Sequence, residues 1–251
     1  MTLRKLFVGV FLSALIASAQ TSVAPATLLG LLSQFRTETD RASKEKILNQ
    51  ITSQFPGAGP DLLALAEGSE NGDTNWMAIR GVGHLKFSPA VPFLEKCLNS
   101  KSVFVRANAA RALGEIDDAS AIDPLIAALS KEDDSGVIEQ TSLAFEMLHA
   151  KRAIPVLKTK IGNPSHQTRI WILGAVELLG GRTELPFIAS ALQDRNIMVR
   201  YEAALIVERL SGQDFEFPEC AKRGNGLCGF DDAPVANARH WWSDHKQEWN
   251  K

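Results

Sequence analysis

Apolar residues recur at helical spacing along most of the chain, and the pattern is clearest between Val105 and Leu129. This stretch, VRANAARALGEIDDASAIDPLIAAL, places apolar residues three and four positions apart in each half, with a polar turn between the halves. The spacing predicts two short amphipathic helices. Two helices of this size cannot bury their apolar faces without similar neighbours, so the stretch predicts one unit of a larger stack.

The same unit recurs at a nearly constant step along the chain. Gly83 and Gly114, 31 positions apart, are each interpreted as closing a first helix. The predicted starts of the second helices keep the same register: Ala90-Val91, Ala121-Ile122, Ala153-Ile154 and Glu184-Leu185. The first helices contain a large apolar column (Val82, Leu113, Phe145, Val176, Val207) beside a column of mostly small residues (Gly81, Ala112, Ala144, Ala175, Ile206). Small residues at a fixed site let neighbouring helices approach closely.

A period held in two separate helices is typical of stacked supersecondary units. It predicts an all-α fold, an α-solenoid of antiparallel helix pairs that forms an α-α superhelix. We expect four pairs between about residues 74 and 194, a degenerate pair over about 40–68, and a lone first helix at about 197–211. The repeat solenoid therefore spans residues 40–211, after a lead-in at 20–39.

The segment 1–19 is typical of a secretory signal peptide. Arg4 and Lys5 give a positive start, an apolar run follows from Leu6 to Ile16, and small residues end the segment. We expect cleavage between Ala19 and Gln20, and a periplasmic or secreted protein. Eleven apolar residues are too few for a retained span, which needs about 20. No other segment approaches membrane length.

Residues 212–251 have no repeat counterpart. Because export permits disulfides, Cys220 and Cys228 in a glycine-rich loop are predicted to form one. Cys97 lies in a helical pattern and is interpreted as a buried free thiol. A helix rich in tryptophan follows from about Pro234, and we expect it to cover the apolar end of the solenoid. The alternative is a ligand-binding pocket built from Trp241, Trp242 and Trp249.

No constellation of catalytic residues emerges from the sequence. The five histidines lack partners at ligand spacing, and there is no nucleophile elbow or phosphate-binding loop. We therefore predict no catalytic residues, no cofactor and no metal site. A net charge of −2 gives no argument for nucleic acid or an anionic membrane as partner.

The repeats resemble the HEAT-repeat family, in particular the short bacterial type found in phycobilisome-lyase-like proteins. The resemblance rests on these motifs: Val105-Arg106 with Ala109-Ala110 and Leu113-Gly114, then Ala121-Ile122-Asp123-Pro124-Leu125, and Val199-Arg200 with Ala203-Ala204, preceded by Asp194. Ile138 replaces the arginine in one copy, so an Asp–Arg ladder along the stack is incomplete. A scaffold of this type implies a fold and usually a protein partner, while a few members are bilin lyases.

In HEAT-like stacks the second helices are expected to line the concave face. The exposed column there would hold small and polar residues, with charged neighbours, and no basic stripe that would indicate nucleic acid. The candidate interaction surface is Glu95, Lys96, Ala127, Lys158, Thr159 and Ser190.

These observations favour an exported scaffold that mediates protein–protein interaction without catalysis, with an unknown protein or peptide partner. Two alternatives stay open. One is an enzyme or enzyme accessory of the lyase type, which needs a pocket with convergent polar groups. The other is a small-ligand module that uses the aromatic C-terminal tail.

Overall fold

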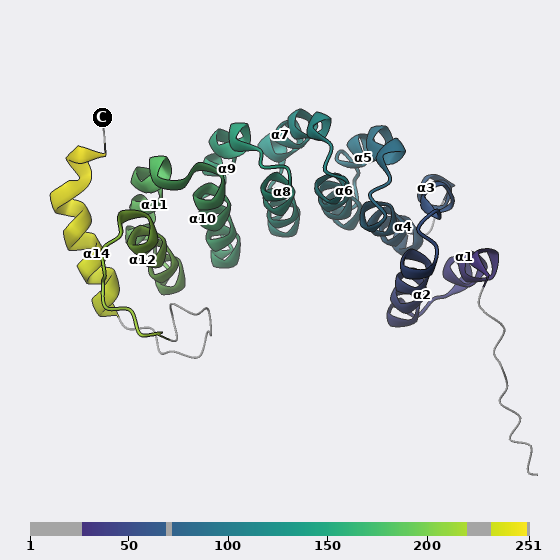
Figure 1. The fold of residues 1–251 in the computed structure, drawn as a ribbon, viewed down its shortest axis with the longest axis horizontal. Helices are drawn as coiled ribbons and strands as arrows, with labels where there is room; N and C mark the ends of the chain where they lie inside the picture. Colours follow the sequence, from purple (N-terminus) through teal and green to yellow (C-terminus); the bar gives the residue numbers. More distant parts are fainter. Residues whose placement is uncertain (1–26, 69–71, 220–231, 250–251) are drawn as a thin grey trace, which may run out of the picture.

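The computed structural model describes residues 27–68, 72–219 and 232–249. The described chain is helical and contains no strand, and the helices stack side by side into an arch (Figure 1). The predicted all-α solenoid is therefore confirmed. No helix of the described residues is long and apolar enough to cross a membrane. The predicted signal peptide with Ala19 and Gln20, and the predicted disulfide between Cys220 and Cys228, lie outside the described residues.

The helix pairs follow the predicted register. The four regular pairs are α4–α5, α6–α7, α8–α9 and α10–α11, and each second helix opens with a short 3₁₀ turn. Helices α1 to α3 precede them, and α12 and α14 follow. The bounds are α1 Leu28–Thr37, α2 Arg41–Gln54, α3 Gly59–Gly68, α4 Gly72–His84, α5 Val91–Cys97, α6 Val103–Ile116, α7 Ile122–Lys131, α8 Ser135–Met147, α9 Ile154–Thr159, α10 His166–Gly180, α11 Leu185–Ser190, α12 Ile197–Ser211 and α14 Asp232–His245.

Polar residues at the helix starts explain where the first helices begin. Asp134, Ser165 and Asn196 each accept a hydrogen bond from a backbone N–H in the first turn of α8, α10 and α12. Such caps satisfy donors that have no partner within the helix. The large apolar column then points into the core, where Val82, Leu113, Phe145, Val176 and Val207 are all fully buried.

The first helices form the inner layer of the arch and the second helices form the outer layer (Figure 1). The expectation that second helices line the concave face is therefore wrong. The reason lies in the column of small residues, which belongs to the first helices. Neighbouring first helices pack closely, whereas successive second helices barely touch. The layer with the shorter spacing becomes the inside of the curve.

Gly83 and Gly114 do not close their helices, as the sequence suggested, but lie inside the last turn. Each lies against the next first helix, where a Cβ atom would meet the Cα atom of Ala112 at 2.8 Å or of Ala144 at 2.6 Å. These distances are shorter than real Cβ atoms tolerate. Glycine is therefore present for close helix approach at both positions.

Arginines join successive repeats on the turns between the layers. Arg106 donates to the carboxylate of Glu132 at 2.7 and 3.1 Å, and also to the carbonyl oxygen of Ser100 before its own helix. Ile138 interrupts this arrangement in α8, as predicted. There Lys160 donates to the carbonyl oxygen of Glu132 at 2.7 Å and holds the turn from the following repeat.

Helix α14 packs on α12 at the C-terminal end of the stack. Val235 and Ala238 of α14 are fully buried. Arg239 donates two hydrogen bonds, of 2.9 and 2.7 Å, to the carbonyl oxygen of Leu192. This helix therefore covers apolar surface that a further repeat would otherwise cover.

Candidate functional site

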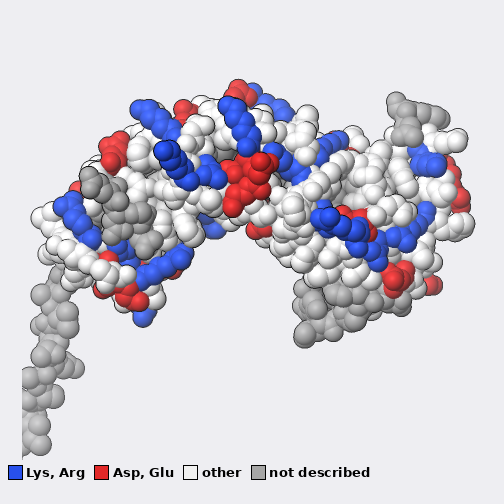
Figure 2. Space-filling view, turned by 180° about the vertical axis from the view of Figure 1, so that it is seen from behind, with Lys and Arg blue, Asp and Glu red and all other residues white. Residues whose placement is uncertain are grey.

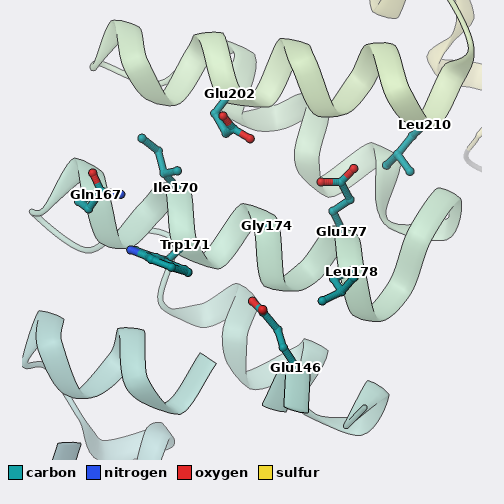
Figure 3. Close-up of a pocket in the computed structure, with 9 residues that line it drawn as sticks. All are labelled: Glu146, Gln167, Ile170, Trp171, Gly174, Glu177, Leu178, Glu202 and Leu210. Carbon is teal, nitrogen blue, oxygen red and sulfur yellow. The ribbon is translucent and has the colours of Figure 1, made fainter. Parts of the chain in front are cut away.

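The inner layer contains a groove of about 660 Å³ between α8, α10 and α12 (Figure 3). Only first helices contribute to it, so it opens on the concave side of the arch. Its lining combines apolar side chains with carboxylates: Glu146, Gln167, Ile170, Trp171, Gly174, Glu177, Leu178, Glu202 and Leu210.

One stripe along α10 runs through the groove and carries two large exposed apolar side chains. Gln167, Trp171, Gly174 and Leu178 are spaced three or four positions apart and so share one face of the helix. Trp171 is 41% exposed and Leu178 is 66% exposed. No atom lies within 4 Å of where a Cβ of Gly174 would stand, so this glycine leaves a notch between them. Large apolar side chains exposed together are unusual on a surface without a partner.

Two of the three groove carboxylates, Glu146 and Glu177, come from the same repeat column as the close-packing glycines. Counting in repeat steps from Gly83 leads to Gly114, then to Glu146, Glu177 and Glu208. The glycines hold α4, α6 and α8 tightly together, whereas α8, α10 and α12 pack less closely. A glutamate side chain needs the room that glycine leaves empty. The change from glycine to glutamate therefore opens the stack and places carboxylates in the opening.

Three helices direct their carboxylates toward this space: α8 with Glu146, α10 with Glu177 and α12 with Glu202 (Figure 3). Arg209 forms a two-bond pair with Glu177 at 2.8 and 2.9 Å, and its Nη2 lies 3.7 Å from Glu202. The side chain of Glu146 has no hydrogen-bond or ion-pair partner among the described residues.

For two of these carboxyl groups, burial is the largest influence on the pKa. It raises the pKa of Glu146 above its ordinary value of 4.5. It also raises the pKa of Glu202, where the nearby charge of Arg209 opposes the rise and that of Glu177 adds to it. A carboxylate withdrawn from water without a full partner carries an unfavourable desolvation free energy. The groove therefore presents negative charge that a cation from outside would stabilise.

The predicted interaction surface lies on the other side of the molecule. Its residues belong to the outer helices α5, α7, α9 and α11. Lys96, Ala127, Thr159 and Ser190 are exposed, as the helical pattern indicated, whereas Glu95 and Lys158 are half-buried. Lys158 pairs with Glu184, and its Nζ lies 5.2 Å from the ring centre of Phe187. Their role in binding a partner stays a prediction.

The tryptophans of the tail pack against the end of the stack. Trp241 and Trp242 are partly buried against the core. Trp241 stacks on His245 with ring centres 4.9 Å apart, and the guanidinium of Arg182 lies 5.1 Å from the ring centre of Trp249. The groove of the inner layer and three smaller cavities of the described chain are lined by other residues.

In the described part of the chain, no three His, Cys, Asp or Glu side chains gather as metal ligands would. Cys97 is a buried free thiol, as predicted, and burial raises its pKa to about 11. Such a thiol is a poor nucleophile at neutral pH.

Charge on the back face of the arch is mixed. Figure 2 shows acidic side chains between basic ones on the face seen from behind, without a continuous basic stripe.

The exposed Phe104 belongs to a packed cluster instead of an open site. It stacks on Trp76, and the guanidinium of Arg41 lies 4.7 Å from the ring centre of Trp76.

A family model described as HEAT repeats matches residues 59–146 of the chain. These residues are HEAT repeats. The match covers helices α3 to α8 almost entirely, and α10 to α12 continue the same repeat step beyond it. No curated protein matches the chain.

Two solved structures are similar to this chain. One is the complex of CpcE and CpcF of phycocyanin lyase from Nostoc sp. PCC7120, with 17% identity and a TM-score of 0.55. The match covers 88% of this chain and 88% of the chain in that structure, and this similarity shows a shared fold. The other is an engineered protein with 17% identity and a TM-score of 0.36, which covers 88% of this chain and 96% of that chain.

Sequence reasoning missed the groove although a signal was present. The columns through Val82 and through the small residue beside it predict how the first helices pack. The signal for the groove lies in the neighbouring column, which contains Gly83 and Gly114. That column continues to Glu146 and Glu177, and a charged residue that replaces glycine at a helix contact marks a change in packing. The exposure of Trp171 required the curvature of the arch and could not be read from spacing.

Proposed function

We propose that this protein is an exported scaffold that binds another protein through the inner face of its arch and catalyses no reaction of its own. The observation that carries the proposal is the exposure of Trp171 and Leu178 within the concave groove. Large apolar and aromatic side chains in a recess are typical anchors of protein interfaces. Curved solenoids present their concave surfaces in this way.

The similar solved structure supports a role in assembly. CpcE and CpcF are present there as a complex, so a solenoid of this fold associates with another protein in that case. Identity of 17% supports nothing finer, such as lyase activity or its substrate. The proposal of binding without catalysis rests on the sequence, which contains no recognisable catalytic motif.

Export is proposed from the sequence pattern of the segment 1–19. The test is the mass of the protein recovered from the periplasmic fraction or the medium. We expect a chain that begins at Gln20, with a mass lower by two hydrogen atoms for a bond between Cys220 and Cys228. A chain that starts at Met1 in the cytosolic fraction would contradict export.

Binding through the inner face is tested by site-specific photo-crosslinking in cells. A photoreactive amino acid replaces Leu178 in the groove or, as the matched control, the exposed Ala127 on the outer helix α7. We expect covalent adducts with a defined protein from position 178 and none from 127. Adducts from 127 alone would favour the outer surface. If neither position forms adducts, the proposal that a protein binds either face of the arch is contradicted.

A further inference from the structure

We infer that the groove between α8, α10 and α12 receives a basic amphipathic segment of a partner protein. Its Lys or Arg side chains would pair with Glu146 and Glu202, and its apolar side chains would pack on Trp171 and Leu178. This inference rests on the proposed function, because it names the chemistry of the partner at the same site.

The charge of the lining indicates a cationic partner. The nine lining residues include three carboxylates and no basic side chain. Arg209 stands at the rim and is 51% exposed, and its two-bond pair already engages Glu177. This pair shows how a guanidinium fits between α10 and α12 in this molecule. It leaves Glu146 without a partner among the described residues and Glu202 with a contact of only 3.7 Å.

Burial strengthens the argument for these two glutamates. Both are half-buried, and burial raises the pKa of each. A cation that docks against them replaces the lost hydration, and the attraction between the opposite charges is stronger in the sheltered groove than at an open surface. Complementary charge of this kind selects partners of opposite sign.

The apolar stripe indicates that the cation belongs to an amphipathic segment. Trp171 and Leu178 lie on the same face of α10, and the open space over Gly174 separates them. An apolar side chain of the partner fits this notch without clash. A Lys or Arg beside it reaches Glu146 on one side or Glu202 on the other, since these belong to the flanking helices (Figure 3). Recognition by a helix in a groove uses this combination of anchors.

The test uses the full exported chain and a short fluorescein-labelled peptide of leucine and lysine arranged as an amphipathic helix, with binding measured by fluorescence anisotropy. We expect saturable binding that weakens with added salt, and no binding of the same peptide with glutamate for lysine. The variant Glu146→Lys is expected to weaken binding about tenfold or more. Trp171→Ala is expected to weaken it to a similar degree.

The control is Glu67→Lys, which makes the same charge change at an exposed position of helix α3, outside both the groove and the predicted interaction surface. We expect it to change affinity less than about twofold. Equal losses in both variants would show attraction to net charge alone and overturn the inference. Unchanged binding by Glu146→Lys, with a circular dichroism spectrum like that of the original chain, would also overturn it.

The failure of this inference is distinguishable from that of the proposed function. One outcome is that adducts form at position 178 just as efficiently when the chain also carries Glu146→Lys. In that case a protein binds the inner face, and the inference that it does so with a basic segment is wrong. If sedimentation shows a dimer that Trp171→Ala disrupts, the groove binds a second copy of this chain and the inference is overturned.

Discussion

The guanidinium of Arg169 on α10 forms two hydrogen bonds of 2.8 Å with the carboxylate of Asp194, 25 residues later in the turn before α12. Its remaining nitrogen donates to the carbonyl oxygens of Asn163 and Pro164, at 2.7 and 3.1 Å. One side chain therefore joins the turns on either side of a repeat. In the preceding repeat, Ile138 stands in the arginine position and Asn163 in the carboxylate position, so both charges are absent together.

Replacing Arg169 tests the strength of this link. The side chain is 4% exposed, and Arg169→Ala leaves Asp194 half-buried without its cation. We expect a loss of about 3–5 kcal/mol in the free energy of unfolding. Arg152→Ala removes an exposed pair with Asp123 and is expected to cost about 1 kcal/mol or less. Urea unfolding followed by circular dichroism measures both, and similar midpoints for the two variants would contradict the role of Arg169.

Acid should weaken the same link. Burial opposes the ionisation of Asp194, but hydrogen bonds from Arg169 and the Asn196 N–H outweigh it, so its pKa lies below 3.8. A lowered pKa in the folded chain stabilises it above the ordinary pKa, and the contribution is lost as pH falls through the lower value. The stability difference between the original chain and Asp194→Asn is therefore expected to shrink below about pH 4. Thermal unfolding at several pH values measures it, and a difference that stays constant down to pH 2 would be inconsistent with this ion pair.

Glu146 should behave in the opposite way. Because burial raises its pKa, the ionised side chain destabilises the folded chain at neutral pH, and the penalty disappears as pH falls below about 4. Glu146→Gln is therefore expected to raise the melting temperature at pH 7 and to leave it unchanged at pH 4. Glu95→Gln on the outer layer serves as the control. A Glu146→Gln chain that is less stable at pH 7 would show that the carboxylate has a stabilising partner.

Two glycines test how helix spacing shapes the arch. A Cβ at position 114 would lie 2.6 Å from the Cα of Ala144, so Gly114→Ala is expected to destabilise by about 1–3 kcal/mol. Gly174→Ala places its methyl group in open space within a helix and is expected to stabilise by about 0.5–1 kcal/mol. Both are measured by urea unfolding. The proposed packing is wrong if the two substitutions change the free energy of unfolding in the same direction.

The cover at the C-terminal end can be tested with two alanines of α14. Ala238 is fully buried against the stack, whereas Ala236 on the same helix is exposed. Ala238→Asp buries an unpaired charge and is expected to cost about 3 kcal/mol or more and to promote aggregation. Ala236→Asp should leave the melting temperature and the scattering profile unchanged. Equal behaviour of the two chains would show that α14 does not cover this end.

The repeat follows from the sequence alone. A nearly constant step between Val82, Leu113 and their counterparts predicted the helices, their pairing and the buried column, because local periodicity decides which face of a helix is apolar. It also indicated the positions at which the second helices begin. The motifs at Val105-Arg106 and Val199-Arg200 were enough to indicate the family of repeats.

Which layer faces inward, and where the stack opens, depends on the assembled arch. Curvature results from the difference in spacing between two layers, and that difference depends on how Gly114 meets Ala144 across helices far apart in sequence. The same contact, changed to Glu146 and Glu177 in the later copies, leaves room for the groove. Trp171 and Leu178 are exposed because α8, α10 and α12 pack less closely on the inner side, which is a property of the stacked helices together and of no single helix.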